Sequence, residues 1–408
     1  MTATPLIAES QLQGGFYAPH FEVTVGGSGL PQEVVRDITQ VTYRDSITQL
    51  DDFEITVNNW DPDARGFKYV GSETAEALRS GTAEGARYRL FEPSEKKRVE
   101  VRMGYLDSLR VMLTGTITTI EPGFRAGGAP TLTVRGLNAL QALRSKQYSK
   151  EWFGLRDSEI AQNIATLNDQ TTGRKRFPLP IDIDPAALQK EPPLDYVAER
   201  SQYDIDFLFG RARTRGYVLF IQEADPTVSG SKQRFYFGPP SSRLPGLRPV
   251  TFRLEWGKSL MEFNPTLTTV NQVQSVTVVG HNRRTKTQIR ETVTLDDQRF
   301  TANRDLFALV KAGDREHVVV NEPVFTPQQA RERAYAILLD RVRNLVKVSA
   351  TTIGLPDLRA GQLVEITELG CRFSGTYFVT DTTHTISDGG YTTRFNARRE
   401  DLGQGGGR

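Results

Sequence analysis

Closely spaced aspartates are the residues of this sequence that could most readily carry out chemistry. The pairs are Asp51 with Asp52, Asp182 with Asp184, Asp204 with Asp206, and Asp296 with Asp297. Two carboxylates across a cleft can act as the acid and the base of a glycosidase, and an Asp-x-Asp spacing can supply oxygen ligands to a cation. A structural interpretation competes with both, because Asp182 and Asp184 precede Pro185 in a predicted turn and Asp204 is placed to cap a helix. We expect the structural roles.

A glycine-rich segment and a lone cysteine are weaker candidates. Gly26–Gly29 has neither a GxGxxG pattern nor a following Gly-Lys-Ser/Thr, so we expect a hairpin turn between strands. Cys371 would need a nearby histidine to become a reactive thiol. His384 is close in sequence, but we expect Cys371 to be a bystander.

Two arginine clusters could bind phosphate. One contains Arg211, Arg213 and Arg215, and the other contains Arg394, Arg398 and Arg399. Neither is interleaved with aromatic residues as a groove for single-stranded nucleic acid would be, so we expect salt-bridged helix and strand faces. The sequence therefore predicts no catalytic, cofactor-binding or metal-binding residues, and a protein that is not an enzyme.

Composition excludes several classes of function. Lys and Arg number 51 and Asp and Glu number 49 in 408 residues, and a net charge of +2 gives no overall attraction to nucleic acid or anionic lipid. The single cysteine excludes an intrachain disulfide and a cysteine-based zinc site. No apolar run approaches the roughly 18 residues of a spanning helix, and the N-terminus lacks the pattern of a secretory signal. We expect neither a nucleic-acid partner nor a membrane span.

Residues 1–150 have the pattern of a β domain. Apolar and polar residues alternate in short segments that glycine and proline separate. The expected strands are residues 20–25, 38–43, 53–57, 99–103, 113–120 and 131–134. Residues 61–85 are polar and are expected to form a surface excursion. The spacing predicts a β-barrel or sandwich.

Residues 151–249 change to the pattern of a small α/β module. Asp157 is placed to cap one helix, and further helices are expected to begin near Pro193 and at Asp204. Strands are expected at residues 217–222 and 233–237. Gly216 is placed to end the last helix. Residues 180–190 are expected to be a linker or turn, and the proline-rich residues 239–249 predict a boundary.

Residues 250–402 return to a β pattern, and residues 403–408 are expected to be a flexible tail. The expected strands are residues 275–279, 291–295, 318–320, 363–367, 377–385 and 391–397. One long helix is predicted over residues 326–347, where Thr326, Pro327 and Gln329 resemble a capping box. Its apolar stripe consists of Ala330, Ala334, Leu338, Val342 and Leu345. The charged face is expected to point outward from the second β domain.

The two β regions share a weak repeat. Gly115-Thr116 begins one threonine-rich strand and Gly375-Thr376 begins another, and in each case a second strand begins 16 residues after the glycine, at Thr131 and at Tyr391. Both pairs predict long hairpins that close a barrel. The repeat suggests two barrels of similar design.

Several segments, taken in order, resemble the late control protein D family, which comprises the baseplate hub proteins of contractile phage tails and related injection systems. They are VTYRDSITQLDDFEITVNNW (41–60), SEIAQNIA and YDIDFLFGRARTRGY within 158–217, WGKSLMEFNP and VQSVTVVG within 256–280, and a C-terminal block from PQQARERAYAILLDRV to GGYTTRFNARRE. One departure is His281-Asn282-Arg283, where many relatives have a Trp-Asp-Pro-like turn.

The resemblance implies a mainly β (α+β) fold with two tail-tube-like β-barrels, residues 1–150 and 250–402, an inserted α/β module at 151–249 and one long helix on the second barrel. It implies a homotrimer whose six barrels match the six-fold inner tube, while its other face seats a three-fold spike. Because the sequence stops soon after Arg399, the trimeric spike is expected to be a separate protein, and no lysozyme-like activity is expected. Other baseplate proteins are the remaining expected partners. Assembly is expected in the bacterial cytoplasm, and the product is part of a phage tail or injection-system particle.

A second hypothesis stays open. The chain could be a β-rich carbohydrate-binding protein or a glycosidase that uses its aspartate pairs. Joint substitution of Asp182 and Asp184 distinguishes the two, because loss of an activity with intact assembly would favour the second hypothesis.

Overall fold

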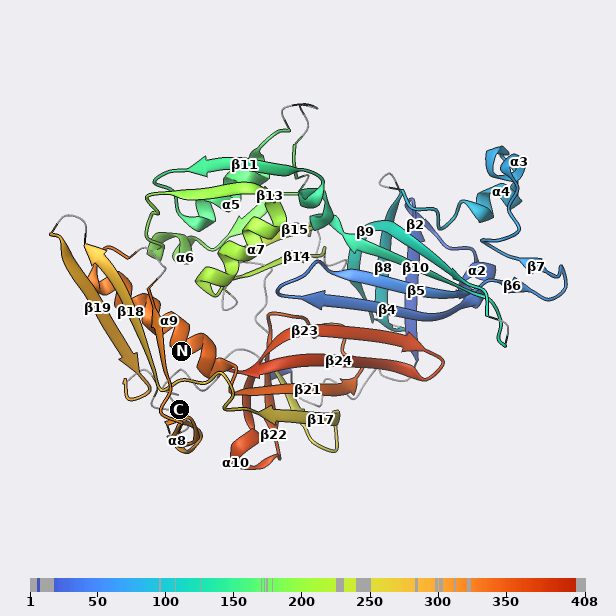
Figure 1. Cartoon of the computed structure of the whole chain (residues 1–408). Coiled ribbons are helices and arrows are strands. Elements are labelled where there is room, and N and C mark those ends of the chain that lie inside the picture. The colour runs from blue at the N-terminus through green and yellow to red at the C-terminus, as the bar shows by residue number, and fades with distance from the viewer. Residues whose placement is uncertain are drawn as a thin grey trace. The chain divides into compact units, whose positions relative to one another are not determined.

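The computed structural model describes residues 6–7, 18–94, 97–106, 108–125, 127–169, 171, 173, 175–177, 179–224, 231–239, 251–282, 285–297, 300, 304–311, 313–320 and 324–400 (Figure 1). The predicted tail at 403–408 and residues 240–249 of the predicted boundary lie outside the described residues. The mainly β, α+β class is confirmed by the elements that follow.

The chain divides into two compact units. The first unit comprises Met1–Val250, Ile353–Gln362 and Asp381–Arg394, and the second comprises Thr251–Thr352, Leu363–Thr380 and Phe395–Arg408. Strands β23 (Gly375–Ser387) and β24 (Gly390–Arg399) therefore contribute residues to both units. The domain boundaries predicted at 150/151 and 249/250 stay predictions.

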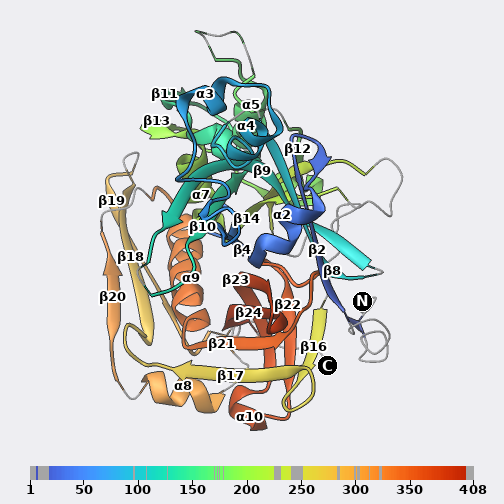
Figure 2. The same cartoon turned by 90° about the vertical axis from the view of Figure 1, so that its right-hand side faces the viewer.

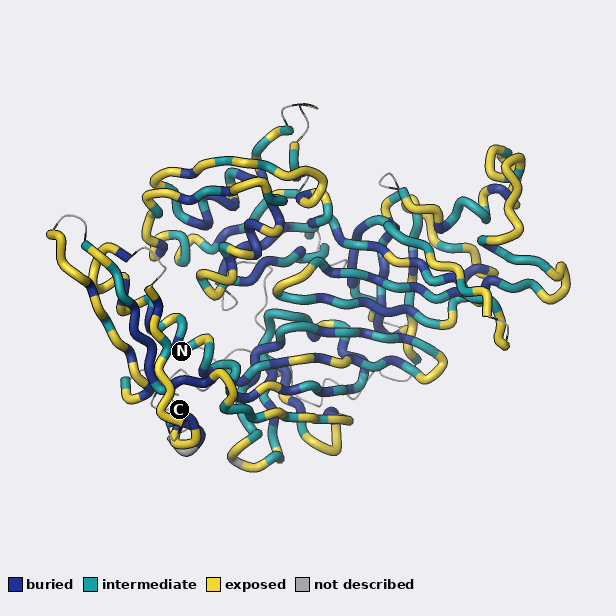
Figure 3. The backbone as a smooth tube through the Cα atoms, viewed as in Figure 1, coloured by how far each residue is buried: buried dark blue, intermediate teal, exposed yellow. Residues whose placement is uncertain are grey.

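An antiparallel sheet forms the main core of the first unit. Its strands are β2 (Pro19–Val25), β3 (Ser28–Gly29), β4 (Ile38–Ser46), β5 (Asp52–Asn58), β8 (Arg98–Tyr105), β9 (Ser108–Gly123) and β10 (Thr131–Asn138). They follow the order β23-β4-β5-β10-β9-β8-β2-β3. Alternation places Phe53, Ile55 and Val57 of β5 on the buried face, and Figure 3 shows buried and partly exposed residues alternating along these strands.

Two of the predicted hairpins are confirmed in this sheet. Gly26 and Gly27 link β2 to β3 with φ of +64° and +85°, values that a two-residue hairpin turn requires and that glycine adopts without strain. Strands β9 and β10 pair from Gly115 with Asn138 to Gly123 with Thr131. The remaining elements of this part are β1 (Leu6–Ile7), α2 (Gln32–Asp37), β6 (Trp60–Asp61), β7 (Gly66–Phe67), α3 (Ala75–Arg79), α4 (Ala83–Tyr88) and the 3-10 helix η1 (Ala139–Arg144).

The first unit also contains the α/β module. Its elements are β11 (Gln147–Trp152), α5 (Asp157–Thr166), β12 (Ile181–Ile183), α6 (Pro185–Lys190), β13 (Val197–Tyr203), α7 (Asp204–Arg215), β14 (Val218–Gln222) and β15 (Arg234–Gly238). Strands β11 and β13 pair with each other, and β12, β15 and β14 form a separate sheet. Helix α7 begins at Asp204 as predicted, and Gly216 ends it with a φ of +70°. The predicted role of Asp157 as the cap of α5 is wrong, because Arg156 occupies the cap position and Asp157 is the first helical residue.

The prediction of a helix near Pro193 is wrong. Residues 197–203 form strand β13, and the helix of this region is α6, within the segment expected to be a linker. The physical reason is local, because Asp184 accepts hydrogen bonds from the amides of Ala186 and Ala187 and Pro185 occupies the first helical turn.

The second unit contains two groups of strands. One comprises β16 (Thr251–Glu255), β17 (Leu260–Leu267), β21 (Val346–Ile353), β22 (Leu363–Thr367) and the parts of β23 and β24 assigned to this unit. Strand β21 lies between β17 and β24. The other group is a sheet in the order β19 (Thr287–Thr294), β18 (Ser275–Asn282), β20 (Glu316–Val319). The helices are α8 (Arg304–Lys311), α9 (Pro327–Arg343) and α10 (Gly370–Phe373).

Helix α9 begins as predicted and ends earlier. The Thr326 hydroxyl accepts from the Gln329 amide, and the Gln329 side chain accepts from the Phe325 amide. The stripe of Ala330, Ala334, Leu338 and Val342 is fully buried, and α9 packs against β18 and β19 (Figures 1 and 2). The predicted end at Lys347 is wrong, because residues from Val346 onward pair with β17 as strand β21. Closure of either sheet into a barrel stays a prediction.

Candidate functional site

The aspartates of the predicted pairs have separate local partners. Asp51 accepts a hydrogen bond from Asn138 at 2.8 Å, whereas Asp52 pairs with Arg44 at 2.7 Å. Asp182 pairs with Arg234 at 3.0 Å, and Asp184 caps α6. Asp206 pairs with Arg144 at 2.6 Å, Asp296 with Lys311, and Asp297 with Arg331 at 3.6 Å. Asp182 lies on strand β12 and Asp184 is the cap of α6, so the turn predicted before Pro185 is wrong, and the absence of a catalytic role for this pair stays a prediction.

The predicted role of Asp204 as a helix cap is wrong. Tyr203 occupies the cap position, and Asp204 is the buried first residue of α7, 3.4 Å from Arg176. Burial and the adjacent Asp204 raise the pKa of Glu199 to about 8, and burial also raises the pKa of Asp204. Glu199 lies on the buried face of β13, two residues after Val197. The alternation of buried and exposed positions along a strand could have predicted the burial of Glu199 from the sequence.

Two arginines of the first cluster form ion pairs with one buried carboxylate. Arg211 and Arg215 each lie 2.5 Å from a different carboxylate oxygen of Asp157, which is buried at the start of α5. Arg213 is exposed on the same helix. The expected salt-bridged face is confirmed for Arg211 and Arg215. Because the guanidinium groups of Arg211 and Arg215 are already paired with Asp157, they are poorly placed to bind a phosphate.

His384 is part of a packed hydrogen-bond network. Its Nε2 lies 2.9 Å from the carbonyl oxygen of Leu358, which can only accept, so Nε2 carries the proton. Its Nδ1 then accepts from the hydroxyl of Tyr391 at 3.0 Å or of Thr393 at 3.1 Å. Burial lowers the pKa of His384 well below its ordinary value, so the ring is neutral. The side chain of Cys371 lies outside what the structure describes.

A buried ionic cluster in the first unit was not anticipated. We call it the Arg359 cluster and define it as Arg359, Tyr43, Asp45, Asp51 and Glu223. The Arg359 Cζ lies 4.7 Å from the centroid of the Tyr43 ring, Nη2 donates to the Val111 carbonyl at 3.3 Å, and Nη1 is buried. Tyr43 and Asp45 share the buried face of β4, but the strand predicted at residues 38–43 ended before Asp45, so its alternation did not include this carboxyl.

The carboxyls of the Arg359 cluster are held by donors of several elements. Asp45 accepts from the amide of Ala360 at 3.1 Å and from the hydroxyl of Thr382. Glu223 accepts from both the amide and the hydroxyl of Thr114, each at 3.0 Å. Burial raises the pKa of Asp45 and Asp51, and it raises the pKa of Glu223 to about 7. The cluster therefore contains one guanidinium, that of Arg359, and three carboxyls. Protonation of a carboxyl reduces this excess of negative charge.

The segment that carries Arg359 is fastened at several points within the first unit. Tyr105 donates to the Gly354 carbonyl at 3.0 Å, and the Leu355 amide donates to Thr393 at 2.9 Å. A Cβ at Gly354 would lie 2.1 Å from the Tyr391 ring, so only glycine allows this approach. These contacts make Ile353–Gln362 a packed part of the first unit.

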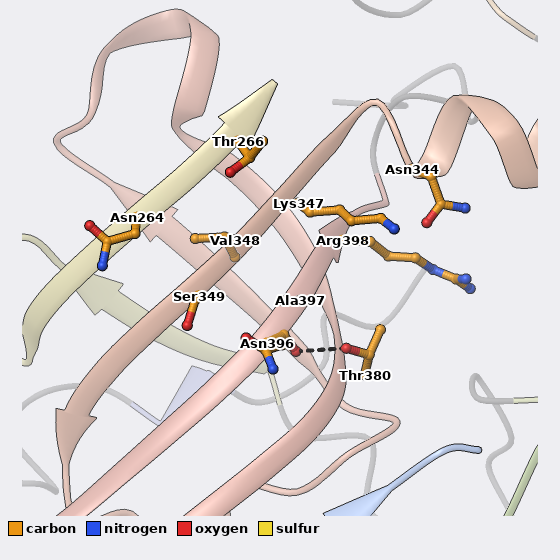
Figure 4. A pocket seen from close by; sticks show the side chains of 10 residues that line it. All are labelled: Asn264, Thr266, Asn344, Lys347, Val348, Ser349, Thr380, Asn396, Ala397 and Arg398. Carbon is orange, nitrogen blue, oxygen red and sulfur yellow. Dashed lines mark hydrogen bonds between the residues drawn. The ribbon is translucent and has the colours of Figure 1, made fainter. Parts of the chain in front are cut away.

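A hollow of about 410 Å³ lies in the described part of the second unit. We call it the cationic hollow and define it by Lys347, Arg398, Asn264, Thr266, Ser349 and Asn396. Strands β17, β21 and β24 supply these side chains, and Figure 4 shows Lys347 and Arg398 extending toward Asn344 at the end of α9. Of the second arginine cluster, Arg398 thus lines a hollow, Arg399 is buried and donates to the Arg372 carbonyl, and Arg394 is exposed on β24.

None of the helices in the described ranges is both long and apolar enough to cross a membrane.

Sequence comparison matches residues 79–388 to the family described as the Alg8 N-terminal domain. The chain belongs to this Alg8 N-terminal domain family. The matched range includes Asp157, Glu223 and Arg359, whereas Tyr43, Asp45 and Asp51 of the Arg359 cluster precede it. No curated protein sequence matches the chain.

Solved structures of tail proteins share the fold. The 43 kDa tail protein of prophage MuSo2 from Shewanella oneidensis is 14% identical with a TM-score of 0.62, and the match covers 94% of this chain and 99% of that one. A tail protein from Neisseria meningitidis MC58 is 13% identical with a TM-score of 0.60, covering 95% and 98%. An E. coli component of the type VI secretion system is 11% identical with a TM-score of 0.50, covering 95% and 79%.

These matches show that this Alg8 N-terminal domain family member has the fold of phage tail proteins and of related secretion-system proteins. The resemblance found in the sequence is confirmed at the level of the fold. Because the sequence identities are between 11% and 14%, the matches bear on the fold alone.

Proposed function

We propose that the protein is a structural component of a phage tail or related injection particle, and that it acts there as the baseplate hub. The observation that carries the proposal is the likeness in fold to the tail protein from Shewanella oneidensis, which extends over 94% of this chain and 99% of that protein. A match along the full length of both chains supports a shared architecture rather than one shared domain.

The finer part of the proposal is a homotrimer that adapts a six-fold inner tube to a separate three-fold spike. Two β-sheet regions in one chain support it, because three chains then present six such regions. A Gly-Thr pair begins β23 at Gly375, whereas the pair at Gly115 lies within β9, seven residues after the strand starts at Ser108, so the prediction that this pair begins a strand is wrong. Each strand pairs with the next in a hairpin, which fits regions of similar design. Other baseplate proteins are the remaining partners, and assembly takes place in the bacterial cytoplasm before incorporation into the particle.

We propose further that the protein has no enzymatic activity. The support is that the aspartates that could have been catalytic have local structural partners, such as Arg234 for Asp182 and the helix amides for Asp184. A variant with both Asp182→Asn and Asp184→Asn should assemble as the parent chain does. A carbohydrate-hydrolysing activity that the parent shows and this variant lacks would favour the enzyme hypothesis.

The decisive experiment is the mass of the purified chain in solution by light scattering, with negative-stain images of the same peak. The hub proposal predicts a particle of three times 45.6 kDa with three-fold views. A ring that forms only after a spike protein is added would support the hub role, but it would contradict the prediction that the isolated chain forms a trimer. A monomer that stays monomeric with tube and spike proteins would contradict the proposal.

A further inference from the structure

The cationic hollow presents positive charge with no acidic residue among the described residues that line it. Lys347 is exposed on β21, and the Arg398 side chain keeps 20% of its surface accessible. The remaining lining is mostly amide and hydroxyl groups, which can both donate and accept hydrogen bonds. This combination suits a ligand that carries negative charge and main-chain polar groups.

Arg398 is only weakly neutralised by its surroundings. Its nearest ion-pair distances are 3.9 Å to Asp340 and 4.0 Å to Glu400, both longer than a hydrogen bond. Glu400 makes a shorter pair with Arg343. The Arg398 Nε is buried without a hydrogen-bond partner among the described residues, and Cζ lies 5.0 Å from the Phe378 ring centroid. The guanidinium is thus held in position by packing while it keeps donors for an incoming carboxylate.

The side chains around the two cations come from adjacent strands. Asn264 lies on β17, Ser349 lies on β21 beside Lys347, and Asn396 lies on β24 beside Arg398. Strand β21 pairs with β17 on one side and β24 on the other, so these groups span the width of three strands. An extended peptide laid across them could place carboxylates on the cations and its main chain on the amides.

We propose that the cationic hollow binds an acidic segment of a protein partner. Its carboxylates contact Lys347 and Arg398, and one of its main-chain amides donates to the Oδ1 of Asn264, whose Nδ2 already donates to Glu262 at 2.8 Å. Nucleic acid fits less well, because two cations neutralise few phosphates and the described lining residues include no aromatic side chain for base stacking. The inference goes beyond the hub proposal and does not depend on trimer formation.

The test is binding of fluorescein-labelled hexaglutamate to the full chain by fluorescence anisotropy at low ionic strength, where screening is weak. Lys347→Glu should weaken binding by about tenfold or more, which corresponds to ~1.4 kcal/mol. The matched control is Arg290→Glu, because Arg290 is exposed on β19 in the same unit and the charge change is equal. It should change affinity by less than about twofold. Arg398→Gln should reproduce the loss, and circular dichroism checks that each variant is folded.

Several outcomes would overturn the proposal. One is the absence of saturable binding, and another is equal weakening by Lys347→Glu and Arg290→Glu, which would indicate attraction to net charge alone. Displacement of the peptide by millimolar inorganic phosphate, with the same sensitivity to Lys347→Glu, would identify a phosphate site. Tighter binding of a thymidine oligonucleotide than of hexaglutamate, lost in the same variant, would identify a nucleic-acid site. The mass of the particle in solution is recorded for each variant, so failure of the hub proposal is seen separately.

Discussion

Two arginines of this chain lie against aromatic rings in opposite electrostatic surroundings. Arg359 is 4.7 Å from the centroid of Tyr43, and Arg398 is 5.0 Å from that of Phe378. Around Arg359, burial alone would lower its pKa, but the acidic groups beside it, including Tyr43 and Asp45, raise the value. Around Arg398, burial is the largest influence and lowers the pKa, and the neighbouring Arg343 lowers it as well, against the opposing effect of Glu400 and Asp340.

The difference shows what decides the use of an arginine. In the Arg359 cluster the neighbouring carboxyls are themselves buried, so the guanidinium is needed to make their burial tolerable. In the cationic hollow the other lining residues are mostly amides and hydroxyls, and the nearest carboxylates, Asp340 and Glu400, lie too far from Arg398 to accept a hydrogen bond from it. The first arginine should therefore contribute to stability and the second to binding, and the following experiments test that division.

The largest effect is expected from Arg359→Met. This variant keeps an unbranched apolar stem but leaves Asp45 without its counter-charge, which should lower the free energy of unfolding by about 3–5 kcal/mol. Urea denaturation monitored by intrinsic fluorescence measures it, with Arg290→Met as the exposed control. A loss of less than about 1 kcal/mol would mean that the carboxyls are protonated and do not need the arginine.

A smaller loss is expected when the Arg359-bearing segment is displaced. Gly354→Ala would place a Cβ 2.1 Å from the ring of Tyr391, so the segment or the ring must move, at a cost of about 1–3 kcal/mol. The control is Gly127→Ala, where no atom lies within 4 Å of the added carbon. Equal stability of the two variants would show that the segment is loosely packed.

The pH dependence of stability should report on Glu223. Its pKa is about 7 in the folded chain and its ordinary value is 4.5, so folding takes up a proton between these values and stability falls as pH rises from 5 to 8. Glu223→Gln mimics the protonated group and should reduce this fall by about 1–2 kcal/mol. Denaturation curves at several pH values give the slope for each protein. Identical slopes would mean that Glu223 is ionised throughout that range.

The smallest effect on stability is expected from Arg398→Met. The methionine keeps contact with Phe378 and removes only long ion pairs, so the free energy of unfolding should change by about 0.5–1 kcal/mol. The same urea titration measures it. A loss of unfolding free energy as large as that of Arg359→Met would mean that both arginines act mainly in stability. It would also weaken the binding proposal for the cationic hollow.

Local features of the fold could be predicted from the sequence. Strand β22 has the predicted bounds, and the start of α9 follows from Thr326, Pro327 and Gln329, which act within a single turn. The prediction failed near Pro193 and at the end of α9, where one short helix cap and one strand pairing decided the structure. Pairing with β17 involves residues far away in the sequence, so the periodicity of residues 344–347 could not reveal it.

The sequence by itself determined the mainly β class, the strand alternation and the absence of an evident catalytic motif, because these depend on residue type and on neighbours within a few positions. Tertiary structure alone decided the partners of its charges. Asp45 meets the Ala360 amide across 315 positions, and Arg359 meets the Val111 carbonyl across 248. Contacts at such separations depend on how strands are paired, and a single sequence does not state the pairing. The same is true of the cationic hollow, which exists because β17, β21 and β24 lie side by side.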